Sequence, residues 1–128
     1  MNGTVELTIP VRSDLLILAR LTAAAMAGRA EFGIEDIEDL RLVVEELCLS
    51  VIGRNKTGAV HLHFTEDAGV ITVGCSLWGE GDLDERGEDD PDDLSLRIIE
   101  ALVDEYGEDM ADGRRQAWIR KHRSKVAS

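Results

Sequence analysis

The sequence has little of what would tie it to export, a membrane or a disulfide framework. Its two cysteines, Cys48 and Cys75, have no paired spacing, and a reducing cytosol is the default for such a chain. No apolar run approaches the roughly 20 residues that cross a bilayer. The first ten residues, MNGTVELTIP, have neither the basic start nor the apolar centre of a signal peptide. We therefore expect a cytoplasmic protein that has no contact with a membrane.

Basic residues are also scarce. The chain has 14 Lys and Arg against 26 Asp and Glu, a formal net charge of −12. A nucleic-acid-binding domain normally carries a basic footprint, so a nucleic-acid partner is not expected. The acidic residues are dense between positions 80 and 112, whereas basic residues gather between 114 and 125. This pattern fits either a solvated loop followed by a basic tail, or a surface that selects a basic protein partner.

The chain has 128 residues, of which 44% are apolar, and we expect one domain spanning residues 1–128. Its periodicities predict strands, helices and loops in a simple order. Antiparallel pairs with helices covering one face indicate an α+β two-layer sandwich. The predicted elements are a strand at 5–11, a helix at 14–28 capped by Ser13, a helix from 34 to 53, strands at 59–65 and 70–77, an acidic loop at 78–92, a helix from 92 or 93 to 104, and strands at 106–110 and 116–121.

The second predicted helix carries two different lines of side chains. One line recurs at three- and four-residue steps and is apolar, which predicts a buried stripe. The other line has a carboxylate and a hydroxyl four residues apart and is not core-like. The predicted stripe is Ile34, Ile37, Leu40, Val44, Leu47 and Val51, and the second line is Leu42, Glu46, Ser50 and Gly53.

Most familiar catalytic motifs are missing. There is no GxSxG and no GxxxxGK[ST] phosphate loop. His61 and His63 with Cys75 would supply three ligands of a zinc site, but no fourth ligand is evident, and buried apolar cysteines are the better interpretation. The GEG at 79–81 follows a strand as a phosphate cradle would, but it stands among acidic residues.

The order of these pieces resembles the RsbW-type anti-sigma factors, which are serine protein kinases of the GHKL (Bergerat) ATPase superfamily. The resemblance covers almost the whole chain. It is carried by GIEDIEDLRLVVEELCLSVI, the hairpin, GEG, the acidic loop and DLSLRIIEALVDEYG. It implies the histidine-kinase-like ATPase fold, with a mixed, mostly antiparallel sheet and helices on one face.

The resemblance also assigns positions to the nucleotide site. Glu46 matches the family's catalytic glutamate, and Ser50 stands where the family has the asparagine that holds Mg²⁺. Leu77 stands where an aspartate accepts the adenine amino group, followed by the matching glycines Gly79 and Gly81. Asp93 and Ser95 stand where the second glycine box has its two glycines.

Three of these departures oppose nucleotide binding. Leu77 cannot accept a hydrogen bond, and an unpaired buried donor costs on the order of 1–3 kcal/mol. Ser50 is too short to place an oxygen where an asparagine amide would. Asp93 sets a negative charge where phosphates would approach a helix start. We therefore expect no cofactor, with weak ATP and Mg²⁺ binding as the alternative.

The protein-binding half of the family's activity is what the resemblance then implies. Its members pair as homodimers, hold a sigma factor and exchange it for an anti-anti-sigma partner of the STAS fold. We predict a non-catalytic regulator of this partner-switching kind. The alternatives are an active ATP-dependent serine kinase that phosphorylates a STAS-type antagonist, and a non-enzymatic interaction scaffold.

Overall fold

A computed structural model describes residues 3–79 and 93–124 of the chain. The elements follow one another in the predicted order, with a short 3-10 turn before the first helix. Their bounds are β1 (Gly3–Pro10), η1 (Ser13–Leu15), α1 (Leu16–Arg29), α2 (Ile34–Ile52), β2 (Ala59–Asp67), β3 (Val70–Trp78), α3 (Asp93–Leu102), β4 (Glu105–Ala111) and β5 (Arg114–His122).

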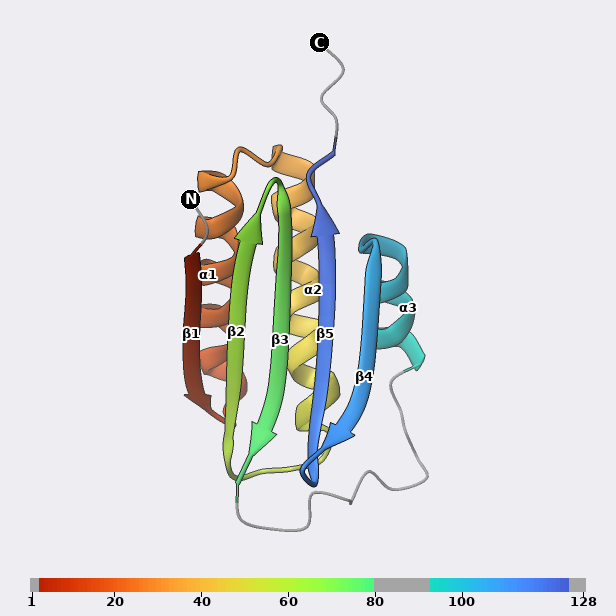
Figure 1. Ribbon diagram of the computed structural model, residues 1–128. Coiled ribbons are helices and arrows are strands. Elements are labelled where there is room, and N and C mark those ends of the chain that lie inside the picture. Colours follow the sequence, from red (N-terminus) through yellow and green to blue (C-terminus); the bar gives the residue numbers. More distant parts are fainter. Residues whose placement is uncertain (1–2, 80–92, 125–128) are drawn as a thin grey trace.

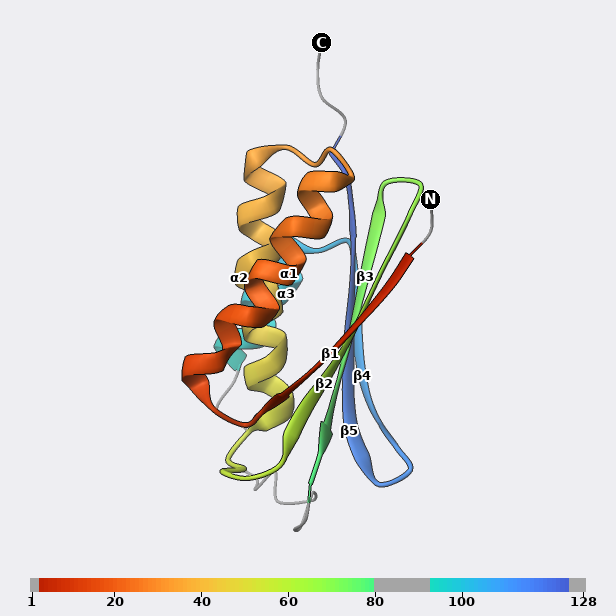
Figure 2. The same ribbon diagram turned by 90° about the vertical axis from the view of Figure 1, so that its left-hand side faces the viewer.

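The strands form one five-stranded sheet in the order β1-β2-β3-β5-β4, in which every described pair is antiparallel. Figures 1 and 2 show all three helices on one face of this sheet, with the other face uncovered. The predicted α+β sandwich with helices on one face is confirmed, but the sheet is antiparallel throughout its described pairs rather than mixed. In the part of the chain that the structure describes, no helix is long and apolar enough to span a membrane.

The two hairpins turn through residues with positive φ. Ala68 and Gly69 join β2 to β3 with φ of 52° and 81°, and Asp112 and Gly113 join β4 to β5 with φ of 56° and 75°. Two central residues with positive φ are the signature of the turn that matches the twist of antiparallel strands. These short turns fix the register, so that Val60, Leu62 and Phe64 all face the helices, as their alternation predicts.

Helix α2 supplies much of the core. Leu40, Val44, Leu47 and Val51 of the predicted stripe are buried, and Gly53 ends the helix with a φ of 55°. Ile34 is different: it is 81% exposed. Ile34 is the first residue of α2, and the neighbouring elements that cover the rest of the stripe do not extend to it.

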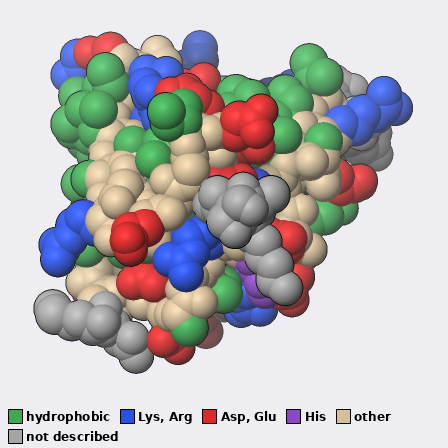
Figure 3. Space-filling view, turned by 90° about the horizontal axis from the view of Figure 1, so that it is seen from above, with side chains coloured by type: hydrophobic (Ala, Val, Ile, Leu, Met, Phe, Trp, Pro, Cys, Tyr) green, Lys and Arg blue, Asp and Glu red, His purple; other side chains and the backbone are tan. Residues whose placement is uncertain are grey.

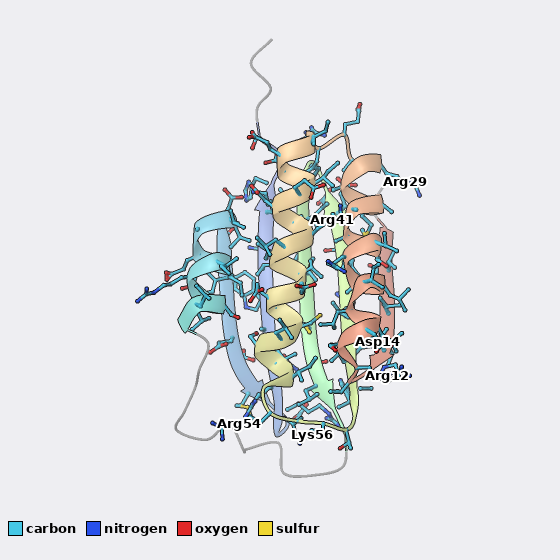
Figure 4. The ribbon with its side chains drawn as sticks, turned by 180° about the vertical axis from the view of Figure 1, so that it is seen from behind. Arg12, Asp14, Arg29, Arg41, Arg54 and Lys56 are labelled. Carbon is cyan, nitrogen blue, oxygen red and sulfur yellow. The ribbon has the colours of Figure 1, made fainter. Side chains whose placement is uncertain are left out.

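The predicted cap of the first helix is also wrong. Ser13 belongs to the turn η1, and neither Arg12 nor Leu15, the residues that precede η1 and α1, makes a side-chain capping hydrogen bond. Instead Arg12 Nη2 donates to Asp14 Oδ2 at 2.8 Å, and Figure 4 shows the two side chains together at the start of the helix. Because Ser13 is part of the 3-10 turn η1, it does not stand at the position that caps α1.

A buried polar cluster ties the end of the chain to two helices. Lys121 Nζ donates to the Leu102 carbonyl at 2.7 Å and lies 3.7 Å from Asp36 Oδ1. The Asp36 carboxylate also accepts hydrogen bonds from the Ser124 backbone N–H and hydroxyl, both at 2.9 Å. Strand β5 is thereby held against the start of α2 and the end of α3.

Candidate functional site

The candidate site lies where the second half of α2 meets α3 and the ends of β3 and β5. Glu46 projects from α2 and is half-buried, and Ser95 lies in the first turns of α3 and is buried. The Ser95 hydroxyl donates to Glu46 Oε1 at 2.5 Å, across 49 residues of sequence. Two positions from separate predicted motifs are therefore in direct contact, and one Glu46 oxygen already has a partner from within the chain.

Ser50 lies one helical turn beyond Glu46 on the same helix. It is buried, and its hydroxyl donates to the Leu47 carbonyl at 2.8 Å. Back-bonding of this kind is typical of a serine inside a helix. The hydroxyl hydrogen thus points along the helix to its own backbone.

Leu77 stands at the end of β3 and is completely buried among the core residues. Two residues on, Gly79 passes close to another glycine: a Cβ at Gly79 would lie 2.8 Å from Gly58 Cα. This approach gives Gly79 a structural requirement that is independent of any phosphate. Gly81 lies outside the described residues, and Asp93 is the first residue of α3, with its side chain outside the described part.

The sequence pattern did not identify Arg115 as a site residue, but the fold brings it to the candidate site near Leu77. Antiparallel pairing joins Ser76 to Gln116, and the same register one residue further sets Leu77 beside Arg115 on the helix-covered face. Arg115 is only 4% exposed. Its Nη1 would lie 2.6 Å from a Cβ at Gly53, so the guanidinium reaches from β5 to the end of α2. The guanidinium therefore lies at the end of α2, on the face of the sheet to which Leu77 also belongs.

Known proteins share this architecture and its order of elements. A family model described as "Histidine kinase-like ATPase domain" matches residues 9–121. This chain belongs to the histidine kinase-like ATPase family. At the positions where the sequence predicts a nucleotide site, Glu46 contacts Ser95, and Leu77 and Arg115 lie on the same face of neighbouring strands.

Among relatives of known name, the chain is similar to serine-protein kinases RsbW. It is 28% identical over 102 residues to the protein of Bacillus cereus strain B4264, covering 80% of this chain and 58% of that protein. It is 32% identical over 74 residues to those of Bacillus cereus strain G9842 and Halalkalibacterium halodurans, covering 58% and 55% of this chain and 41% and 46% of theirs. The chain therefore spans about half the length of these relatives, and the RsbW-type resemblance is confirmed at the level of the family.

Two buried thiols lie just behind the site in this histidine kinase-like domain. Cys48 follows Glu46 by two residues on α2, and Cys75 precedes Leu77 by two residues on β3. Burial, and then the hydrogen bond with the Cys48 thiol, raises the pKa of Cys75 well above its usual value. A raised pKa keeps the thiol protonated and poorly nucleophilic, as expected for core cysteines.

The geometry separates the three ligands of the hypothetical zinc site. Cys75 faces the helices, whereas His61 and His63 lie on the uncovered face of the sheet. His61 is held there by Thr8 Oγ1 at 2.8 Å and by Glu6 Oε1 at 3.0 Å. Within residues 3–79 and 93–124, no three His, Cys, Asp or Glu side chains gather as metal ligands would.

The Glu46–Ser95 hydrogen bond leads to a stability prediction. Replacing Ser95 with alanine removes the only donor described for Glu46 Oε1 and one link between α2 and α3. A hydrogen bond to a charged group contributes about 1.5–3 kcal/mol, and half-exposure of Glu46 reduces the expected loss to about 1–2 kcal/mol. Urea denaturation should show this loss, and hydrogen exchange should show faster exchange within α3.

Ser13→Ala is the matched control, because Ser13 is exposed in the turn before α1, and α1 lies on the other side of α2 from α3 (Figure 4). It should change the unfolding free energy by less than about 0.5 kcal/mol. Equal stability of the two variants, with unchanged exchange in α3, would show that the contact does not hold α3 in place.

Proposed function

We propose that this chain is a non-catalytic regulator of transcription that binds a sigma factor, and that it exchanges this partner for a STAS-type antagonist without phosphorylating it. The observation that carries the loss of catalysis is the pair Leu77 and Arg115. Both are buried on the helix-covered face of neighbouring strands, and Arg115 reaches the end of α2. We infer that together they occupy the space where the family pattern sets the adenine.

The chemistry of that pair opposes adenine recognition. The adenine amino group is a donor and needs an acceptor. A leucine side chain offers none, and a guanidinium has five N–H donors and no acceptor. Binding adenine would require displacing a buried cation and leaving the amino group unpaired, which costs on the order of 1–3 kcal/mol.

The catalytic position is altered as well. A carboxylate that acts as a general base must reach the proton that it removes. Glu46 Oε1 instead accepts the Ser95 hydroxyl at 2.5 Å. Position 50 holds a serine in place of the amide that would bind magnesium. The two helix residues that would activate a phosphoryl acceptor, Glu46 and Ser50, therefore make other interactions.

Charge supports the choice of partner. A surface with a net charge of −12 attracts basic proteins and repels acidic ones. Sigma factors have basic DNA-binding faces, so an acidic regulator suits them. The sigma factor follows from the RsbW-type resemblance, since similarity of fold alone does not give a function.

We further propose that the chain forms a homodimer through one apolar surface, the α1 patch, defined as Val5, Ile17, Leu18, Leu21 and Met26. Val5, Ile17, Leu18 and Leu21 are 40–52% exposed, and a groove of about 430 Å³ runs between α1 and the edge strand β1. Figure 3 shows hydrophobic side chains gathered on the side where α1 lies. Contiguous exposed apolar surface of this kind marks an interaction site.

Two other functions are separable from this proposal by experiment. An active serine kinase would need ATP to enter a rebuilt site around Glu46 and Gly79. A scaffold of the same fold would bind neither a sigma factor nor a STAS-type protein.

The first prediction here concerns nucleotide binding. Adding millimolar ATP and Mg²⁺ should leave the melting temperature unchanged. A ligand at 100 times its Kd would add about 2.7 kcal/mol of apparent stability, so even moderate binding would be visible in thermal unfolding. A clear rise in the melting temperature would contradict the proposal and favour the kinase.

A reconstructed site provides the positive control for this measurement. Ser50→Asn with Leu77→Asp restores the two missing polar groups, but Arg115 still fills the space. We expect that double variant to show no shift, and the triple variant with Arg115→Ala to show one. Circular dichroism of each variant would establish that it remains folded before ATP is added.

The second prediction concerns the partner. When the purified chain is mixed with each sigma factor of its own genome, one should co-elute with it in gel filtration. The complex should form equally with and without ATP and Mg²⁺, because the proposed binding does not use nucleotide. Failure of every sigma factor to co-elute would favour the scaffold, and transfer of phosphate to a STAS-type protein would favour the kinase.

The third prediction concerns the dimer. Leu21→Asp places a carboxylate in the α1 patch, where Leu21 is 52% exposed, so the change should not disturb folding. Light scattering should show a dimer for the parent chain and at least tenfold weaker association for the variant, equivalent to about 1.4 kcal/mol. Ile34→Asp, at an exposed position on α2, should remain dimeric. Equal association of all three proteins would exclude the α1 patch as the interface.

A further inference from the structure

The face of the sheet that no helix covers carries an unusual set of side chains. Register places every second residue of each strand on this face, here named the open face. Both tryptophans and all three histidines of the chain lie on it, although aromatic residues make up only 4% of the sequence. These five residues are Trp78, Trp118, His61, His63 and His122. A face that only met water would have no physical need for this concentration.

The centre of the open face is hollow. His63, Gly74 and Trp118 stand side by side on β2, β3 and β5, and a Cβ at Gly74 would meet nothing within 4 Å. A pocket of about 190 Å³ opens there, walled by the two imidazoles of His61 and His63 on one side and by Trp118 on the other. Because Gly74 has no side chain, the space between these aromatic residues has room for one large apolar side chain.

The two indole rings are held in place before any partner arrives. Arg114 lies over the ring of Trp78, with 3.5 Å between its Cζ and the ring centroid, and the Trp78 Nε1–H donates to Ser76 Oγ at 2.8 Å. Trp118 lies across Gly107, whose Cβ, if present, would be 2.7 Å from the indole Nε1. Rings that are already ordered lose little conformational entropy on binding.

Charge around the hollow indicates the kind of partner. On the open face, β1, β2 and β4 carry four carboxylates, from Glu6, Asp67, Glu105 and Asp109, and β5 carries the guanidinium groups of Arg114 and Arg120. Arg120 is itself paired with Glu105 at 3.3 Å. Net negative charge at the rim, on a chain of charge −12, complements basic residues.

We propose that the open face is a second protein-docking surface, which takes one large apolar side chain of a basic partner segment into the hollow at Gly74. Tryptophan and arginine are the residue types enriched at interaction hot spots, and both stand on this face. The site lies on the opposite side of the sheet from Glu46 and Leu77, so it is independent of the proposed sigma-factor function.

The test uses defined peptides, because both tryptophans of the chain report on this face. The peptide acetyl-RRFRR-amide has no tryptophan, so selective excitation follows the protein alone. We expect a saturable change in tryptophan fluorescence with a Kd of about 1 mM or tighter. The peptides with alanine in place of phenylalanine (RRARR) and with glutamate in place of arginine (EEFEE) should bind at least tenfold more weakly.

Gly74→Val tests the hollow itself. A Cβ at Gly74 meets open space and valine favours strands, so the variant should fold, yet its side chain occupies the pocket. Its Kd for RRFRR should rise at least tenfold. Thr65→Val, on the same face but not lining the hollow, should bind RRFRR as the parent chain does.

Several outcomes would overturn the proposal. These are no saturable change with RRFRR, equal affinity for RRARR, tighter binding of EEFEE, or unchanged affinity of Gly74→Val. Tighter binding of a ten-nucleotide oligo(dT) than of RRFRR would also overturn it, because the stacked rings would then serve a nucleic acid.

Discussion

The burial of α2 against the sheet is the interaction on which the rest of the structure depends. Leu40, Val44, Leu47 and Val51 lie on one side of the helix and are fully or almost fully buried. The helix contacts α1, α3 and the strands β2, β3 and β5, so it joins all the layers. Its other positions are fixed as a consequence: Glu46 is directed towards α3, and Gly53 ends the helix where Arg115 arrives from β5.

At the candidate site, the predicted nucleotide-site positions make contacts within the fold. Three departures were visible in the sequence, at Ser50, Leu77 and the second glycine box. The structure adds an interaction at each side of the site. Ser95 contacts Glu46, and Arg115 lies beside Leu77. Each of these groups therefore has a partner or neighbour inside the chain.

The two faces of the sheet have different physical characters. The helix-covered face is apolar and carries the candidate site, and burial behind it raises the pKa of the Cys75 thiol. The open face has polar and aromatic residues, ordered by stacked arginines and surrounded by carboxylates. Strand alternation makes this possible, because successive side chains point to opposite faces and one strand serves both.

The order of the elements, the two hairpins and the buried faces of α2 and β2 could be predicted from the amino-acid sequence, because hydrophobic periodicity indicates which side of an element meets the core. The family resemblance predicts that Glu46, Ser50, Leu77 and Gly79 are positions of a nucleotide site. Prediction from the sequence failed for Ser13 and Ile34, at the ends of helices, where neighbours in space rather than periodicity decide burial and capping. The contact of Ser95 with Glu46 and the burial of Arg115 near Leu77, away from the other basic residues of that stretch, depend on the tertiary fold. Both contacts join residues 38 or more positions apart, and no local pattern specifies which distant side chain fills a given space.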